Sequence, residues 1–232
     1  AVNLNIPCSK FGDECLRLQL QLTYADGTTQ TVISDNTWET KPSAITLNGV
    51  HAGEIYNANL ETPLWATTED NSQGWQRVKC IEGPTGMMTA HTAPTDKIVE
   101  TLKPISLHQR QDVAWVVAFG KEISGWLHLH DLKGEKGDTV KVDYISESVQ
   151  GNMRYVMNGS GSEEYAPRFT WFAFSKAVIS GVKELSMRNL TADVVNTHVE
   201  KTADFHTTDT LFNRINEIWQ RSQLDNMHGG IA

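Results

Sequence analysis

Residues 125–131 read Gly125-Trp126-Leu127-His128-Leu129-His130-Asp131, so leucines alternate with aromatic and polar side chains. Such alternation predicts a β-strand with one buried face, because successive side chains of a strand point to opposite sides. Residues 133–138 are rich in glycine and charge and predict a turn. The next stretch, Thr139-Val140-Lys141-Val142-Asp143-Tyr144, alternates again. Two alternating stretches joined by a short polar turn indicate two strands of an antiparallel sheet.

The same kind of pattern continues in both directions along the chain. Further strands are predicted at residues 17–24, 29–33, 113–119, 169–178 and 185–199. Residues 83–97 hold Gly, Pro and Thr and little that could pack, so they predict a domain junction. Short strands at regular spacing are typical of antiparallel β-sandwiches. We therefore expect an all-β chain with two jelly-roll-like sandwich domains, at residues 1–85 and 95–203.

A helix is predicted only near the end of the chain. Between residues 209 and 224 the apolar side chains recur at helical spacing and form one stripe, made of Leu211, Phe212, Ile215, Ile218, Trp219 and Leu224. Thr208 is a candidate N-cap, and Asp209 suits the positive end of the helix dipole. An isolated amphipathic helix needs a partner surface. We expect this helix to pack against a sandwich, pair with another copy, or fray.

Composition excludes several classes of function. The 232 residues carry a formal net charge of −8, which makes the surface a poor match for nucleic acid. No apolar run reaches the length of a membrane span, and no N-terminal segment has the order of a signal peptide. Cys8, Cys15 and Cys80 form no C-x-x-C pair, which argues against a zinc site. They allow one disulfide, although three unpaired thiols are the simpler interpretation.

Trp126, His128 and His130 share one face of the predicted strand, with Asp131 next to them. Metal sites do use His-x-His pairs, but no third or fourth ligand is recognisable, so no metal site is predicted. The alternative is a solvated or interface face of a sheet. An aromatic ring flanked by polar groups also suits stacking on a sugar. These three residues are therefore the candidate carbohydrate-binding residues, and packing against a neighbouring domain is the other interpretation.

Glu122, Glu163 and Glu164 are the carboxylates considered for glycoside hydrolysis. A glycosidase needs two carboxylates at a defined separation across the bond that it breaks. Neighbours on a strand point to opposite faces, and we interpret Glu163 and Glu164 as part of a solvated turn. The sequence has no G-x-S-x-G elbow, no phosphate-binding glycine loop and no H-E-x-x-H motif.

Several stretches together resemble the bacterial α-L-rhamnosidases (glycoside hydrolase family 78-like). Residues 18–28, LQLQLTYADGT, and residues 34–38, SDNTW, are similar to the family's first sandwich. Residues 53–58, GEIYNA, look like its G-E-x-Y-D-A segment, with Asn57 in place of Asp. The most specific likeness is that of residues 165–174, YAPRFTWFAF, to Y-x-P-x-F-T-x-x-x-F. Further similar stretches are residues 123–126, 133–140 and 144–147, and residues 211–230 resemble the first helix of the family's (α/α)₆ catalytic barrel.

The resemblance implies that the parent protein is an inverting glycoside hydrolase that acts on rhamnose-containing plant glycans. Residues 1–85 would be its N-terminal sandwich, residues 95–203 its concanavalin-like sandwich, and residues 204–232 the start of a barrel that is absent from this chain. The family's general acid and base are barrel residues. No catalytic residue is therefore expected here, and the chain alone is expected to be inactive.

The implied partners are carbohydrate and the remaining barrel of the same polypeptide, without nucleic acid or membrane. No cofactor is implied, but calcium stays open because some related sandwiches bind sugar with calcium, although no calcium-ligand motif matches here. Family analogy implies a periplasmic or secreted protein. The alternative from another class is an autonomous carbohydrate-binding module with a sugar-stacking sheet face.

Overall fold

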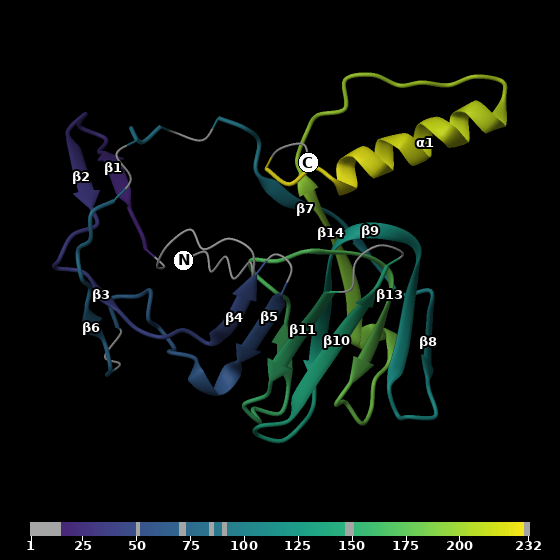
Figure 1. Cartoon of the computed structure of the whole chain (residues 1–232), viewed down its shortest axis with the longest axis horizontal. Helices are drawn as coiled ribbons and strands as arrows, with labels where there is room; N and C mark the ends of the chain where they lie inside the picture. The colour runs from purple at the N-terminus through teal and green to yellow at the C-terminus, as the bar shows by residue number, and fades with distance from the viewer. Residues whose placement is uncertain are drawn as a thin grey trace.

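The computed structural model describes residues 15–49, 52–69, 73–83, 86–89, 92–146 and 151–229. Most of these residues are in strands, turns and loops, and the single α-helix among them, α1 (Thr210–Asp225), lies near the C-terminal end (Figure 1). Two short 3-10 helices, η1 (Ala58–Leu60) and η2 (Met187–Asn189), connect strands. The predicted fold class, an all-β sandwich architecture followed by one helix, is confirmed.

One large sheet dominates the described part of the chain. Its ten strands are β4 (Ile45–Gly49), β5 (Gly53–Asn57), β7 (Asp96–Leu102), β8 (Ser106–Gln109), β9 (Trp115–Leu132), β10 (Thr139–Ile145), β11 (Gly151–Val156), β12 (Glu163–Tyr165), β13 (Phe172–Ser180) and β14 (Leu190–Thr197). The hydrogen-bonded order is β4-β5-β11-β10-β13-β9-β14-β7, while β8 and β12 pair with β9. The strands predicted on either side of residues 133–138 are confirmed as β9 and β10, and β13 lies between them in the sheet.

The long strand β9 makes the sheet curl. Its first residues pair with β8 and β13, and residues 125–129 pair with β14. Between these two parts the register with β13 shifts, and Gly120 adopts a left-handed φ of 80°, which suits glycine. The strand therefore bends over the sheet, as Figure 1 shows, and carries side chains to both parts of the curl.

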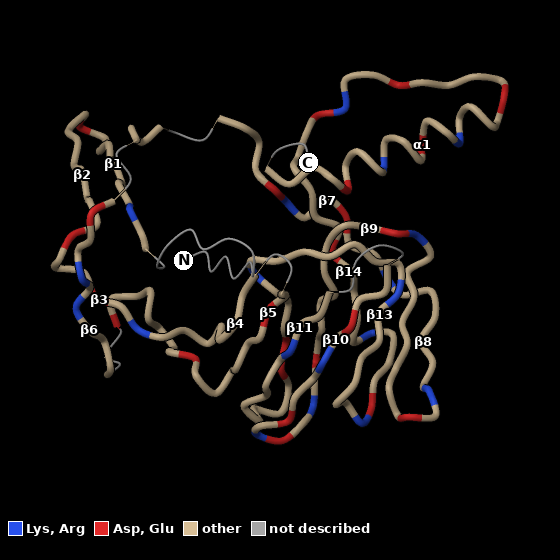
Figure 2. The backbone as a smooth tube through the Cα atoms, in the orientation of Figure 1, with Lys and Arg blue, Asp and Glu red and all other residues tan. Residues whose placement is uncertain are grey.

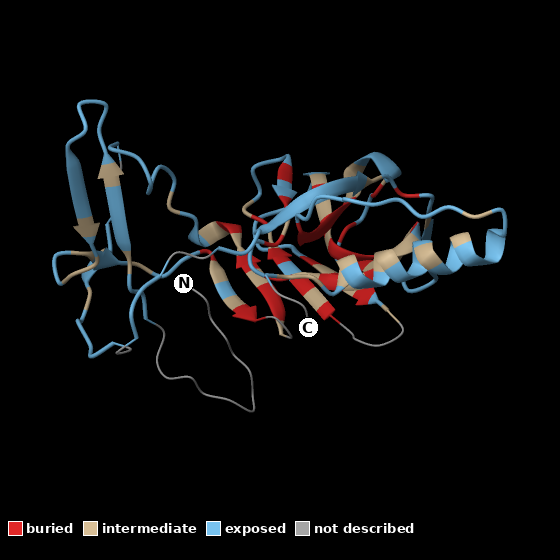
Figure 3. Ribbon diagram, turned by 90° about the horizontal axis from the view of Figure 1, so that it is seen from above, coloured by how far each residue is buried: buried red, intermediate tan, exposed pale blue. Residues whose placement is uncertain are grey.

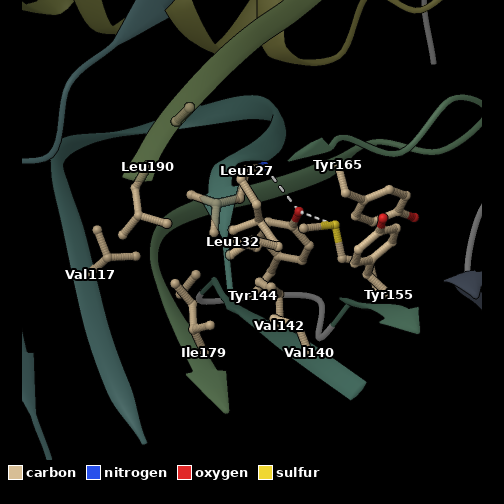
Figure 4. Close-up of a cluster of buried hydrophobic side chains, with 14 of the residues drawn as sticks. Val117, Leu127, Leu132, Val140, Val142, Tyr144, Tyr155, Tyr165, Ile179 and Leu190 are labelled. Carbon is tan, nitrogen blue, oxygen red and sulfur yellow. Dashed lines mark hydrogen bonds between the residues drawn. The ribbon is translucent and has the colours of Figure 1, made fainter. Parts of the chain in front are cut away.

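The core fills the inside of the curl, where buried residues gather in Figure 3. Alternation along β9 places Leu127 and Leu129 inside, each with 0% exposure. At the centre, the Tyr144 hydroxyl accepts a hydrogen bond from the Leu127 amide at 3.0 Å and donates one to Met153 Sδ at 3.2 Å (Figure 4). Each Leu-sized side chain that is buried contributes about 1.5–3 kcal/mol to folding.

Strands from the first predicted domain take part in this sheet. β5 pairs in parallel with β11, so that Glu54 stands opposite Met153, and β4 pairs with β5. This is the one parallel pair among the described strands of an otherwise antiparallel fold. The domain limits 1–85, 95–203 and 204–232 stay predictions, but hydrogen bonds join the first two of these ranges.

The remaining strands form two small sheets, β1 (Gln19–Thr23) with β2 (Thr29–Ile33) and β3 (Glu39–Thr40) with β6 (Gln76–Arg77). The strands predicted at residues 17–24 and 29–33 are confirmed as β1 and β2, which pair as an antiparallel hairpin. Its expected buried face is wrong for this chain, since Leu20 is 48% and Ile33 is 55% exposed. The physical reason is that the hairpin stands apart from the main sheet in both Figures 1 and 3. Cys15 and Cys80 are unpaired and exposed, and Cys8 lies outside the described residues.

The predicted helix is confirmed, but its cap is one residue later than expected. Asp209, not Thr208, is the N-cap, and its carboxylate accepts a hydrogen bond from the Leu211 amide at 2.8 Å. No helix in the described part of the chain is long and apolar enough to cross a membrane. Lys and Arg are interspersed with Asp and Glu along the backbone in Figure 2.

Candidate functional site

Three neighbouring strands bring polar groups together on the outer side of the curled sheet. Trp126, His128 and His130 alternate with the buried leucines of β9 and are partly exposed, so the predicted common face is confirmed. β14 adds Asp193, and β12 adds Glu164. We call these five residues the outer-face cluster. Sequence reasoning identified its members on β9 and missed the two carboxylates as partners of the histidines.

The contacts within the outer-face cluster are direct. His128 Nε2 lies 2.6 Å from Glu164 Oε1, and His128 Nδ1 lies 3.3 Å from Asp193 Oδ2. His130 Nδ1 lies 3.4 Å from the same Glu164 oxygen. The two imidazole rings are 4.0 Å apart between centroids. The indole Nε1 of Trp126 donates a hydrogen bond to Asp193 Oδ2 at 3.2 Å, which fixes the edge of the ring.

These contacts change the acidity of two groups. The hydrogen bond with Asp193 raises the pKa of His128 most, and Glu164 adds to the increase, while burial opposes it. Burial alone would raise the pKa of Asp193, but hydrogen bonds from His128 and from Thr101 lower it on balance. The two effects agree in direction, since each favours an ion pair between an imidazolium and a carboxylate.

One sequence interpretation needs correction here. Glu163 and Glu164 lie on a strand, β12, and not in a solvated turn; as neighbours on a strand they point to opposite sides. Glu163 is buried and accepts hydrogen bonds from the Tyr155 hydroxyl and the Gly159 amide. Asp131 does not join the outer-face cluster, because its left-handed φ of 48° breaks the alternation and its carboxylate binds the Ser162 hydroxyl.

A second polar cluster attaches the end of α1 to the sheet. His228 follows the helix, its side chain is only 8% exposed, and its ring stacks on Trp171 at 3.7 Å between centroids. His228 Nε2 lies 2.6 Å from Ser124 Oγ, and His228 Nδ1 lies 3.0 Å from Asp96 Oδ2. Asp225, the last residue of α1, accepts a hydrogen bond from the Ser124 amide at 3.2 Å. We call these five residues the His228 network.

Ser124, His228 and Asp96 are connected in the order of a Ser-His-Asp triad, yet the surroundings do not suit acyl transfer. The Ser124 residue is wholly buried, so a substrate carbonyl cannot reach its hydroxyl. Its own amide, which an oxyanion hole would use, already donates to the Asp225 carboxylate. A negative group at that position would repel an oxyanion. The His228 network is therefore a structural attachment.

A third cluster connects two of the sequence motifs. Glu54, from GEIYNA, is wholly buried and accepts hydrogen bonds from the Tyr165 hydroxyl at 2.8 Å and the Arg168 amide at 3.1 Å, both from YAPRFTWFAF. The Arg168 guanidinium lies 4.7 Å from the Tyr56 ring centroid. Burial and a hydrogen bond to a carboxylate raise the pKa of Tyr56 to about 12. These motif residues join β5 to the segment that follows β12, so their role is structural.

Comparison with known proteins agrees with the motifs. Residues 7–100 match the alpha-L-rhamnosidase N-terminal domain, and residues 108–196 match the bacterial alpha-L-rhamnosidase concanavalin-like domain. An alpha-L-rhamnosidase from Formosa agariphila is 27% identical over 94% of this chain and 25% of its own length. One from Streptomyces avermitilis is 24% identical over 86% of this chain and 21% of its own length. The chain thus spans about a quarter of the length of these relatives.

Solved structures show the same likeness. The alpha-L-rhamnosidase from Dictyoglumus thermophilum superposes with a TM-score of 0.85 and 26% identity, over 91% of this chain and 26% of that one. The fold also matches the enzyme from Streptomyces avermitilis, with a TM-score of 0.83 and 23% identity over 91% of this chain and 22% of that one. The chain therefore belongs to the alpha-L-rhamnosidase family, of which it carries the N-terminal and concanavalin-like domains.

Proposed function

We propose that this chain is the non-catalytic accessory part of an α-L-rhamnosidase and that it braces the helical catalytic barrel of the same polypeptide. The observation that carries the proposal is the state of α1. The C-terminal end of this helix is attached to the sheet by the His228 network. Five of the six residues of its apolar stripe are nevertheless exposed, by 50% for Ile218 to 62% for Leu211, and Leu224 is half-buried.

An uncovered stripe on an attached helix suits a brace. A short helix is marginal in water without packing, so a stripe of Leu, Phe, Ile and Trp needs an apolar partner. Contiguous exposed apolar surface of this kind marks an interaction site. The attachment holds the helix in one orientation relative to the sheet. This fits a helix that begins a second domain and fixes the position of that domain relative to the sandwich.

The chemistry is proposed for the barrel. Inverting hydrolysis needs one carboxylic acid to protonate the leaving oxygen and one carboxylate to activate water on the opposite face of the sugar. In this chain the buried carboxylates of Glu54 and Glu163 already accept hydrogen bonds from tyrosines and amides. They hold the fold together and are closed to a substrate. Rhamnose-containing plant glycans are the proposed substrates of the whole enzyme.

The first test is hydrolysis of an aryl α-L-rhamnoside. The chain alone should release no aryl alcohol above the buffer rate, while the Formosa agariphila enzyme serves as the positive control. Measurable hydrolysis by the chain that survives further purification would refute the assignment as a non-catalytic part. The bracing role is tested in the longer polypeptide: His228→Ala should shorten the half-life of rhamnosidase activity on heating, and His206→Ala, on an exposed segment, should not.

Sugar binding is the second candidate function, and one observation favours it. The Trp126 ring is fixed by Asp193 on the outer side of the sheet, next to imidazole and carboxylate groups that can bind hydroxyls. Calorimetric titration with rhamnose and pectin fragments, with and without calcium, tests it. Binding that is lost in Trp126→Ala would support a carbohydrate-binding module. Absence of binding to all of these sugars would leave bracing as the role of the sandwiches.

A further inference from the structure

The two histidines of the outer-face cluster are arranged as metal ligands are. We propose that His128, His130 and Glu164 form a binding site for a divalent transition metal ion of the zinc type. The three side chains come from two neighbouring strands, and one ligand atom from each lies within 4.8 Å of the others. His128 Nε2 and His130 Nδ1 both face the same carboxylate oxygen, at 2.6 Å and 3.4 Å. An ion at this convergence point would be bound by two nitrogens and one oxygen.

The groups behind the ligands support this assignment independently. A ligating histidine usually donates its second ring N–H to an acceptor, which fixes the ring and the tautomer. His128 has Asp193 Oδ2 at 3.3 Å from Nδ1, and His130 has Thr191 Oγ1 at 2.9 Å from Nε2. Both acceptors lie on β14, so one strand orients both rings. The other ring nitrogens, His128 Nε2 and His130 Nδ1, remain available for a metal ion, and both face Glu164.

Asp193 is itself held firmly. It is 4% exposed and accepts hydrogen bonds from the Thr101 hydroxyl at 2.8 Å and from the Trp126 indole. A buried carboxylate with several donors keeps its place when the ring in front of it changes partner. His128 is therefore presented by a rigid support, while Glu164, whose side chain is 64% exposed, is free to move by the small distance that ligation requires.

The donor set decides which ions fit. Two imidazoles and one carboxylate are ligands of zinc and its neighbours in the transition series, and the fourth position is left for water. Calcium requires six to eight oxygen ligands, and the three side chains supply one carboxylate only. The site is therefore distinct from a calcium-assisted sugar site. The zinc proposal does not depend on the bracing function, and its test is independent of that function.

The opposing interpretation is an ion pair between a protonated His128 and its two carboxylates, with no metal. Binding measurements separate the two, and they are best made near pH 7, because ligation requires the imidazoles to release their protons and zinc hydroxide precipitates at higher pH. Zinc chloride is titrated into metal-free protein by calorimetry, and thermal unfolding is followed with and without zinc, since an ion that binds only the folded state raises the melting temperature.

We expect one zinc ion per chain, a rise in melting temperature, and no displacement by about 1 mM calcium. His130→Asn and Glu164→Gln should each weaken zinc binding at least about tenfold, and Asp193→Asn should weaken it by about 10–100-fold as an orienting residue. His108→Asn, which changes an exposed histidine on β8, is the matched control and should bind as the parent chain does. Circular dichroism checks that each variant is folded.

Two results would overturn the proposal. The first is no heat and no thermal shift at zinc concentrations up to about 1 mM, which would establish the ion-pair interpretation. The second is zinc binding that His130→Asn and Glu164→Gln leave unchanged, which would place the ion elsewhere. If a histidine variant fails to fold, zinc binding by Glu164→Gln decides between the two interpretations. This variant should fold, because the Glu164 side chain is exposed and the replacement keeps its shape.

Discussion

The attachment of α1 through His228 can be tested quantitatively. His228→Ala removes a neutral hydrogen bond with Ser124, worth about 1 kcal/mol, and a charge-assisted one with Asp96, worth about 1.5–3 kcal/mol. It also removes the stack on Trp171, worth about 0.5–1.5 kcal/mol. The Asp96 side chain is 32% exposed and regains water when its partner is lost, so the lower end, about 3 kcal/mol, is the appropriate expectation.

Hydrogen exchange reports this loss directly. The Thr197 amide donates to the Met227 carbonyl at 2.7 Å, and the Gly229 amide donates to Thr197 Oγ1 at 2.8 Å, so both amides are protected only while the end of the helix is attached. A loss of about 3 kcal/mol should speed their exchange about 100-fold, with core amides such as that of Leu127 unchanged. His206→Ala is the control. Exchange at Thr197 that accelerates less than about threefold in folded His228→Ala would refute the reasoning.

Three further predictions concern other parts of the structure. Burial raises the pKa of Asp225, because a charged carboxylate is costly there. Asp225→Asn keeps an acceptor for the Ser124 amide without that charge, so the melting temperature should hold or rise. A lower melting temperature would count against burial as the cause of the raised pKa. In metal-free protein the pKa of His128 is raised on folding, so its contribution to stability is complete below about pH 6.5 and is lost as pH rises through the folded pKa. The free energy of unfolding measured with urea should therefore fall over this pH range, and His128→Gln should remove the fall. Gly53→Ala places a methyl group in a steric clash with the Asn152 carbonyl oxygen and should prevent soluble folding. Gly27→Ala, at a similar positive φ in open space, should cost about 1–2 kcal/mol in the same unfolding assay. Equal losses of stability in the two variants would contradict the steric argument.

Sequence patterns predicted the local elements well, because alternation and helical periodicity depend on neighbours along the chain. The strand through Leu127 and the helix after Asp209 are examples. The partners of His128 were not predictable in this way, since Glu164 and Asp193 are 36 and 65 residues away and reach it only through strand pairing. Nothing in the sequence near Glu164 specifies that its strand pairs with β9.

The same limit explains the missed attachment of the helix. Ser124 and His228 are separated by 104 residues, and each is unremarkable in its local context. The alternation of Leu20 and its neighbours predicted a strand correctly, but a local pattern states only that a face is apolar. Whether that face is covered depends on what lies beside it, and in this chain Leu20 remains about half exposed.

The parallel pairing of β5 with β11 decides where this protein can be cut. A break between residues 100 and 108, where the two matched domains meet, would take β4, β5 and most or all of β7 away from the main sheet. β11 would then become an open edge with unpaired N–H and C=O groups, which is a template for adding strands from other copies. A shortened piece that starts after the break would also lose Tyr56 and Ala58 from its core and is expected to aggregate, so the smallest portable unit for engineering begins before Ile45.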